Sequence, residues 1–338
     1  MDIRQAIANL VKGVDLTEEE AVAVMNQIMT GGATPSQVAA FLTSLRMKGE
    51  KVQEITGAAR VMREKANRVR VSADRVIDTC GTGGDQSETL NISTAAAFIV
   101  AGAGVTVAKH GNRSVSSKSG SADVLAFLGV KIDASKDKVE ECLEKIGIGF
   151  LFAPMLHEAM KYAVTPRREI GIRTIFNVLG PLTNPAMVTH QLIGVYDGNL
   201  TEPMAQVLMN LGSQRALVVH GEDGLDEISL CGPTRVSELK GDGVISYTLA
   251  PEEVGFKRCR LEDLRGGSPE ACAEILRGIL RGEKGPRRDV ALLNGGAALY
   301  VSGAVDAMGQ GVRMAAESID SGAARQKLDQ LVQLSNSE

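Results

Sequence analysis

The chain contains no tryptophan, and aromatic residues make up only 3% of its 338 residues. Proteins that bind single-stranded nucleic acid stack the bases on aromatic side chains, and general nucleic-acid binders carry a basic excess. Here the formal net charge is -4, from 37 Lys and Arg against 41 Asp and Glu. Composition therefore argues against a general nucleic-acid-binding role, although it leaves room for local basic clusters.

Cysteines and long apolar runs are also scarce. Five cysteines stand at positions 80, 142, 231, 259 and 272, and because their number is odd and CxxC spacing is absent, neither a disulfide framework nor a zinc knuckle is supported. No stretch approaches 18 uninterrupted apolar residues, and the first residues, MDIRQAIANLVKG, lack the apolar core of a secretory signal. We therefore expect a soluble cytoplasmic protein without a membrane span.

The first 65 or so residues carry only helical signals. The segments that begin TEEE at Thr17 and TPSQ at Thr34 have the spacing of capping boxes, and Pro35 takes the first helical position of the second segment. A further helix is expected over roughly 52–65. Strand patterns do not interrupt these helices, so we predict a small helical domain at the start of the chain.

From residue 75 the pattern changes to strands that alternate with helices. RVID, STAAAFIVAGAG and VTVAKH predict a strand, a helix and a strand, the βαβ unit of a parallel sheet. SADVLAFLG predicts the next helix, RALVVHG a later strand, DVALLNGGAALYVSG a buried helix and AARQKLDQLVQLS an amphipathic terminal helix. The expected fold class is α/β, with a small all-helical domain beside a larger domain whose central sheet is mostly parallel.

A glycine-rich loop, GTGGD at 81–85, follows the first predicted strand. It does not match GxGxxG and no GK[ST] follows, which disfavours both a Rossmann cofactor site and a Walker nucleotide site. The loop leads through Asn91, Ser93 and Thr94 into a helix N-terminus, whose free N–H groups and partial positive charge suit phosphate. Alternatively, Ser93 or Thr94 simply caps that helix.

A second polar loop, AKHGNRSVSSKSGSAD, follows the second predicted strand. Within twelve residues it holds Lys109, His110, Arg113 and Lys118, together with Asn112 and four serines. Basic and hydroxyl groups on a glycine-containing loop can surround a pyrophosphate through charge-assisted hydrogen bonds. Because both loops follow strands of one predicted parallel sheet, we favour an anion-binding site over a solvated polar loop.

Two further clusters carry charge. Asp226 and Glu227 follow the strand RALVVHG, and they form either an acidic surface turn or, beside a phosphate site, ligands for Mg²⁺. The segment TPRREIGIRTIFNVLGPLTNPA contains the pair Arg167 and Arg168. One of these arginines can bind a carboxylate through two hydrogen bonds; otherwise they are ordinary charges at the start of a helix.

In this order, these segments closely resemble the anthranilate phosphoribosyltransferase family of tryptophan biosynthesis. The matching segments are GTGGD at 81–85, NIST at 91–94, KHGNRSVSSKSGSAD at 109–123, RREIGIRTIFNVLGPLTNP at 167–185 and DGLDEIS at 223–229, and the likeness spans nearly the whole chain. The resemblance implies transfer of the phosphoribosyl group of 5-phosphoribosyl 1-pyrophosphate to the amine of anthranilate, with Mg²⁺ as cofactor and pyrophosphate as the second product.

The resemblance also implies how the chain is organised. It implies a helical domain at 1–70, joined by part of 167–190, and an α/β domain at 71–338 that binds the phosphoribosyl donor. It implies a homodimer formed through the helical domain, no nucleic acid or membrane as partner, and it allows association with anthranilate synthase subunits.

Site residues follow from the same resemblance. The donor would contact Gly81, Gly84, Asp85, Thr89, Asn91, Ile92, Ser93, Thr94, Lys109, His110, Gly111, Asn112, Arg113, Ser114, Val115, Ser116, Ser117 and Ser121. Anthranilate would contact Gly81, Asn112 and Arg167, and Mg²⁺ would contact Ser93, Asp226 and Glu227. Arg167 is preferred to Arg168 by its spacing from Gly171. No residue is assigned as a catalytic acid or base, and Lys109 and His110 assist by position and electrostatics.

Two other functions share part of this pattern. Pyrimidine nucleoside phosphorylases resemble this fold and share a KHG/S loop, but they would not need the carboxylates at 226–227 for a magnesium–donor complex. The net charge of -4 and the intact segment 167–185 argue against a non-catalytic relative that binds nucleic acid.

An aromatic amine is neutral at neutral pH, so the transfer reaction needs positioning and electrostatics rather than a strong base.

Overall fold

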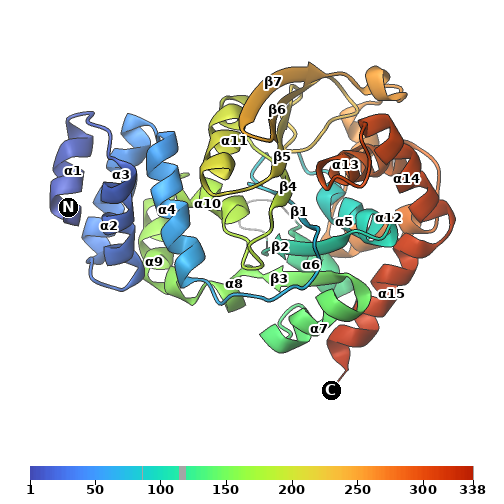
Figure 1. Ribbon diagram of the computed structural model, residues 1–338, viewed down its shortest axis with the longest axis horizontal. Helices are drawn as coiled ribbons and strands as arrows, with labels where there is room; N and C mark the ends of the chain where they lie inside the picture. Colours follow the sequence, from blue (N-terminus) through green and yellow to red (C-terminus); the bar gives the residue numbers. More distant parts are fainter. Residues whose placement is uncertain (86, 114–118, 338) are drawn as a thin grey trace.

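The chain has two lobes, a helical bundle and a larger lobe built on a sheet (Figure 1). The structure is a computed structural model that describes residues 1–85, 87–113 and 119–337. The expected fold class, a small helical domain beside a larger α/β domain with a mostly parallel sheet, is confirmed. Across the described ranges, each helix is too short or too polar to cross a membrane.

The sheet positions the candidate site. Within the described residues it consists of β1 (Val76–Gly81), β2 (Thr106–Gly111), β3 (Ile148–Phe152), β4 (His190–Gly194), β5 (Arg215–Gly221), β6 (Thr234–Lys240) and β7 (Gly243–Leu249). The strand order is β3-β2-β1-β4-β5-β6-β7. Neighbouring strands are parallel in the part β3-β2-β1-β4-β5, whereas β6 pairs antiparallel with β5 and β7 pairs antiparallel with β6. The carboxyl ends of β1, β2, β4 and β5 therefore lie at one edge, where ligands of such sheets bind.

Helices cover both faces of the sheet. The helices that follow the bundle in the chain are α5 (Ile92–Gly102), α6 (Ser121–Phe127), α7 (Lys136–Ile146), α8 (Ala153–Leu156), α9 (Lys161–Ile170), α10 (Phe176–Leu182), α11 (Thr201–Asn210), α12 (Pro269–Leu280), α13 (Pro286–Val301), α14 (Met308–Asp320) and α15 (Ala323–Asn336), and of these α9 packs against the bundle. Successive side chains of a strand point to opposite faces of the sheet and so join different apolar clusters. Ile77 and Leu192 pack with α5 and α13, whereas Cys80 and Ile193 belong to the cluster that includes the helical bundle.

The helical bundle is built from α1 (Ile3–Val11), α2 (Glu18–Met29), α3 (Pro35–Lys48) and α4 (Val52–Lys65). The capping boxes at Thr17 and Thr34 are confirmed, and α4 has the predicted bounds. The structure adds α1, which the sequence analysis did not single out; it begins with a capping box between Asp2 and Gln5. Helix α9, far away in the sequence, packs against α3 and so brings the segment with Arg167 to the bundle.

Candidate active site

The glycine-rich loop begins where β1 ends. The Gly83 amide donates to Asp226 Oδ2 at 2.8 Å, which joins this loop to the acidic segment after β5. Gly83 and Gly84 have φ values of +64° and +78°, a region that glycine adopts without strain. A Cβ at Gly81 would lie 2.6 Å from Asp226 Oδ2. Gly81 is needed because a carboxylate approaches the backbone closely, and Gly83 and Gly84 are needed because their φ values are positive.

The first turn of α5 faces this loop. Asn91 is its N-cap residue and, within the described residues, makes no side-chain cap hydrogen bond. Ser93 and Thr94 lie inside the helix, so the interpretation that one of them is the cap is wrong. The Ser93 amide donates to Glu227 Oε1 at 3.0 Å. Thr94 Oγ1 is buried and has no hydrogen-bond partner among the described residues. A buried hydroxyl without a partner at a helix N-terminus suits a phosphate oxygen.

Lys109 supplies a buried positive charge beneath this turn. Its side chain lies at the end of β2, where Nζ donates to the Thr79 carbonyl oxygen at 2.5 Å and lies 3.4 Å from Ser93 Oγ. Burial lowers the pKa of the ammonium group, while the nearby carboxylates of Asp78 and Glu227 act in the opposite direction. The site therefore combines a cation with the helix N-terminus, both of which attract an anion.

Asp78 and Asn184 support the second loop from below. Asp78 is completely buried, and its carboxylate accepts from the His110 amide at 3.1 Å and from Asn184 Nδ2 at 2.8 Å. Asn184 Nδ2 also donates to the Ala108 carbonyl oxygen at 2.8 Å. The sequence analysis missed both residues. The available signals were an aspartate inside the apolar strand RVID and an asparagine directly before a proline.

His110 and His157 form a neutral pair beside this loop. Their Nε2 atoms are 3.3 Å apart, and both rings are buried. Burial lowers the pKa of His110 to about 3, with a smaller contribution from His157, and lowers the pKa of His157 to about 4. At neutral pH one ring therefore donates a hydrogen bond to the other. The contact fixes the orientation of the two rings relative to each other.

The second loop is described only in part. Ser114, Val115, Ser116 and Ser117 lie outside the described residues. Arg113 Nη1 lies 2.8 Å from Asp123 Oδ1 in an exposed ion pair, and Ser121 Oγ donates to the Asn112 carbonyl oxygen at 3.5 Å. A Cβ at Gly111 would lie 2.3 Å from Ser121 Oγ, so a larger residue would displace this serine.

Asp85, the last residue of the glycine-rich loop, and Thr89, which precedes α5, are two of the residues predicted to bind the phosphoribosyl donor. Asp85 Oδ2 accepts from Ser87 Oγ at 2.5 Å, and Ser87 Oγ lies 3.2 Å from Thr89 Oγ1. Thr89 also forms an isolated antiparallel bridge with Arg265. These contacts link Asp85 to Thr89 through the Ser87 hydroxyl.

Asp226 and Glu227 lie between the glycine-rich loop and α5, and both are partly buried rather than on an exposed turn. Burial raises the pKa of both carboxyl groups. The charges of Asp85 and Glu227 raise the pKa of Asp226 further, and the pKa of Glu227 reaches about 7. Oxygen ligands that repel one another suit Mg²⁺, because a bound cation stabilises their ionised forms. In the described part of the chain, groups of three or more His, Cys, Asp or Glu side chains arranged for a metal are absent, so ligand oxygens or water would complete the coordination.

Arg167 and Arg168 lie in the last turn of α9, so the alternative that they are charges at a helix start is wrong. The guanidinium of Arg167 is partly buried, with Cζ 5.0 Å from the centre of the Phe176 ring, and burial lowers its pKa. Arg168 is exposed. Among the described residues Arg167 has no ion-pair partner, and no hydrogen bond joins it to Asn112. It therefore offers a partly desolvated cation to a carboxylate.

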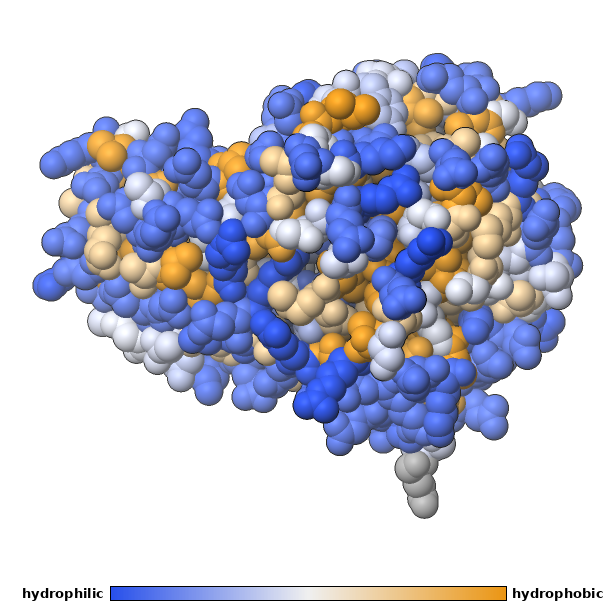
Figure 2. Space-filling model, viewed as in Figure 1, coloured by the Kyte–Doolittle hydropathy of each residue, from blue (hydrophilic) through white to orange (hydrophobic). Residues whose placement is uncertain are grey.

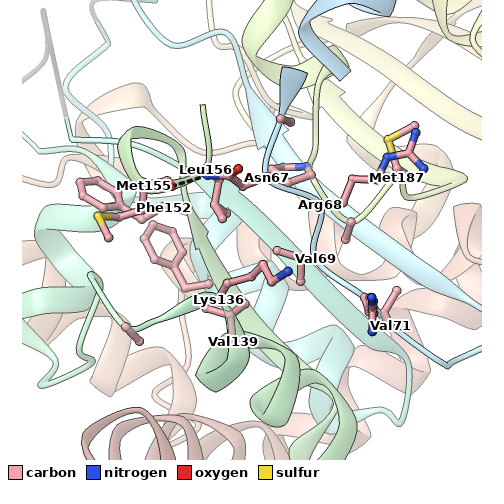
Figure 3. Close-up of a pocket in the computed structure, with 16 residues that line it drawn as sticks. Asn67, Arg68, Val69, Val71, Lys136, Val139, Phe152, Met155, Leu156 and Met187 are labelled. Atoms are coloured by element: carbon pink, nitrogen blue, oxygen red, sulfur yellow. Dashed lines mark hydrogen bonds between the residues drawn. The ribbon is translucent and has the colours of Figure 1, made fainter. Parts of the chain in front are cut away.

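A separate cavity of about 710 Å³ lies beside the edge strand β3 (Figure 3). Residues of the linker between the bundle and β1, including Asn67 and Val69, line one side, and Phe152, Met155 and Lys136 line the others. The residues predicted to bind donor, anthranilate or metal do not line this cavity. The candidate active site therefore lies at the polar groups of the strand ends and not in this cavity.

Two family descriptions together match most of the chain. Residues 4–66 match the helical bundle domain of a glycosyl transferase family, and residues 73–325 match the a/b domain of such a family. The anthranilate phosphoribosyltransferase of Symbiobacterium thermophilum is 57% identical to the chain over 329 residues, which cover 97% of this chain and 96% of that protein.

Two solved structures of anthranilate phosphoribosyltransferases have the same overall fold as this chain. The crystal structure of anthranilate phosphoribosyltransferase from Thermus thermophilus superposes with a TM-score of 0.94 at 45% identity, covering 98% of this chain and 99% of that one. The Saccharomyces cerevisiae enzyme in complex with PRPP and Mg superposes with a TM-score of 0.90 at 28% identity, covering 99% of this chain and 98% of that one. The chain therefore belongs to the anthranilate phosphoribosyltransferase family.

Proposed function

We propose that this chain transfers the phosphoribosyl group of 5-phosphoribosyl 1-pyrophosphate to the amine of anthranilate at the carboxyl ends of β1 and β2. The observation that carries most weight is the buried Thr94 hydroxyl, which has no partner among the described residues and lies in the first turn of α5. Lys109 lies close to that turn. A diphosphate ester would give the hydroxyl an acceptor and would place its charge near a cation and a helix N-terminus.

The uncharged histidine pair beside the second loop fits this chemistry. Breaking the anomeric C–O bond produces an oxocarbenium-like centre and an anionic leaving group. The site must neutralise the pyrophosphate and hold the amine on the opposite face of the ribose, so that the configuration inverts from α to β. Anthranilate attacks through a neutral amine, and the low pKa values of His110 and His157 leave both rings uncharged at neutral pH. Position and electrostatics supply most of the rate.

Asp226, Glu227 and Ser93 are the residues that we propose to hold Mg²⁺. Bound there, the ion would offset the negative charge of the donor phosphates. The two carboxylates already contact the backbone of both donor-binding elements, through the amides of Gly83 and Ser93. Their ionisation is therefore coupled to the geometry of the donor loop.

Anthranilate is fluorescent, which gives a direct test of the proposed function. Its fluorescence should fall when the protein, the donor and Mg²⁺ are mixed, and should stay constant when any one of them is omitted. Phosphorolysis of thymidine or uridine under the same conditions should not be detectable. Constant anthranilate fluorescence together with phosphorolysis would overturn the proposal in favour of a nucleoside phosphorylase.

We expect Arg167→Ala to raise KM for anthranilate by about 10- to 100-fold and to leave KM for the donor nearly unchanged, because a charge-assisted contact contributes about 1.5 to 3 kcal/mol. Steady-state kinetics with each substrate varied in turn measure both constants. Arg168→Ala is the matched control, because Arg168 is the exposed neighbour in the same helical turn. A parallel rise in both KM values would contradict the assigned role.

We also propose a homodimer formed through the helical domain. Val11, Val14 and Met47 are exposed apolar side chains, and the exposed fraction of Met47 is 83%. An ion pair of 2.7 Å between Lys48 and Asp15 joins the last residue of α3 to the connection between α1 and α2, so Met47 and Val14 are each the sequence neighbour of an ion-pair residue. Figure 2 shows apolar surface on the helical lobe. Contiguous exposed apolar surface is typical of interaction sites.

Met47→Glu should therefore convert the dimer, of twice 35.7 kDa, into a monomer, because it would bury a charge without a partner in the interface. Sedimentation velocity measures the mass. Met155→Glu is the control, since Met155 is also an exposed apolar residue but lies on the α/β lobe. The same mass for both variants and the unmodified chain would argue against an interface at this patch. Cytoplasmic location and association with anthranilate synthase subunits stay predictions.

A further inference from the structure

Arg173 contacts the glycine-rich loop from a distant part of the chain. It lies in the connection between α9 and α10, six residues after Arg167, and its guanidinium donates to the carbonyl oxygen of Gly84. Its Cζ also lies 4.2 Å from the centre of the Tyr196 ring. The guanidinium is thus stacked on an aromatic ring while its edge binds the loop.

Gly84 makes this contact possible. A Cβ at that position would lie 3.3 Å from Arg173 Nη2, and the φ of +78° disfavours any other residue. A guanidinium group is planar, so it can stack on a ring and donate hydrogen bonds in its own plane at the same time. A lysine ammonium is not planar and cannot stack on the ring in this way. The contact therefore requires the specific shape of arginine and not only its charge.

Tyr196 connects to the same loop a second time. Its amide donates to Thr82 Oγ1 at 3.0 Å. Burial raises the pKa of its phenol, and the charges of Arg46 and Glu50, both from the helical bundle, also act on this group. Tyr196 thus lies where the helical bundle, the segment after Arg167 and the glycine-rich loop meet.

We propose that Arg173 is a positioning residue, which orients the glycine-rich loop for the phosphoribosyl donor through the Gly84 carbonyl and is itself oriented by Tyr196. The C=O and N–H of one trans peptide point in opposite directions. The bond to the Gly84 carbonyl therefore sets the direction of the Asp85 N–H. This N–H is a hydrogen-bonding group of the loop that we propose to bind the phosphoribosyl donor. The inference rests on the proposed function.

Arg173→Lys tests this inference. It should raise KM for the donor about 10-fold while KM for anthranilate changes less than about twofold, because the loop loses one charge-assisted hydrogen bond but Arg167 is untouched. Tyr196→Phe keeps the ring and should behave like the unmodified chain. Tyr196→Leu removes the ring and should raise KM for the donor in the same direction by a smaller factor. Millimolar methylguanidinium should restore part of the donor affinity of Arg173→Ala, which a merely structural role would not allow.

Calorimetric titration of the Mg²⁺–donor complex separates this inference from the proposed function, because it needs no turnover. If the unmodified chain binds the donor but does not consume anthranilate, the proposed function fails while the role of Arg173 is still measured by the affinities of the variants. Donor affinity that is unchanged in a folded Arg173→Lys variant would overturn the inference. Should that variant unfold, the comparison of Tyr196→Leu with Tyr196→Phe decides, and equal donor affinities for those two would overturn it.

Discussion

Replacing Gly194 by alanine should remove most of the transferase activity and lower the free energy of unfolding by about 1 to 3 kcal/mol. Gly194 ends β4 and is paired with Gly81 at the end of β1. A Cβ on Gly194 would lie 1.5 Å from the carbonyl oxygen of Asp226 and 2.4 Å from its carbonyl carbon. Both are backbone atoms, so no side-chain rotation relieves the clash. The acidic segment must move away from the glycine-rich loop, and the bond from the Gly83 amide to Asp226 is lost with it.

The anthranilate fluorescence assay and urea unfolding measure the two effects. Gly309→Ala is the matched control, because Gly309 lies in α14, its φ is not positive, and a Cβ there would meet no atom within 4 Å. That control should keep full activity and equal or slightly higher stability, since alanine favours a helix over glycine. Wild-type kcat/KM in Gly194→Ala would show that the close approach of Asp226 to β4 is unnecessary for function.

Local signals explain why much of the fold could be predicted from the sequence. The capping boxes at Thr17 and Thr34 involve residues three apart, and the βαβ pattern around the glycine-rich loop lies within one short segment. Pro166 shows where a local rule fails. Proline favours the first position of a helix, which suggests that a helix starts at the arginine pair, but α9 begins at Lys161 and contains Pro166.

The supporting contacts of the site could not be predicted in this way because they join distant residues. Asp78 and Asn184 are separated by 106 positions, and Arg173 and Gly84 by 89. Each pair is close in space only because the sheet places β1 beside β2 and β4. Residue types and spacings in the sequence predict candidate ligand-binding residues, whereas the residues that contact and support those candidates depend on tertiary packing.

Replacing Asp226 by asparagine together with Glu227 by glutamine should lower kcat by about 100-fold and remove its dependence on Mg²⁺, because the donor phosphates then lack the cation that offsets their charge. The amide side chains can still accept from the amides of Gly83 and Ser93, so the loop contacts are retained. The same substitution should make the ligand-free protein more stable at neutral pH, since it removes two carboxylates whose ionisation burial opposes.

The sign of the pH dependence follows from the raised pKa values. A carboxyl group whose pKa is higher in the folded state stabilises the fold below its unfolded pKa, and that contribution is lost as the pH rises through the folded value. For Glu227 this window runs from 4.5 to about 7. The advantage of the double variant in unfolding free energy, measured with EDTA, should therefore be larger at pH 8 than at pH 5. In the unmodified chain, affinity for Mg²⁺ should rise over the same window, because the metal binds the ionised carboxylates.

Titration of activity with Mg²⁺ and urea unfolding at the two pH values measure these effects. Glu222→Gln is the control, because Glu222 is an exposed carboxylate in the same acidic segment and should leave both readouts unchanged. An unaltered Mg²⁺ titration in the double variant would reject the metal site. If instead the Mg²⁺ dependence were lost while the stability difference stayed the same at pH 5 and pH 8, the carboxylates would bind the metal without the desolvation that their burial implies. The Mg²⁺ titration measures whether the two carboxylates bind the cation. The unfolding experiments measure how much their buried charges destabilise the metal-free protein.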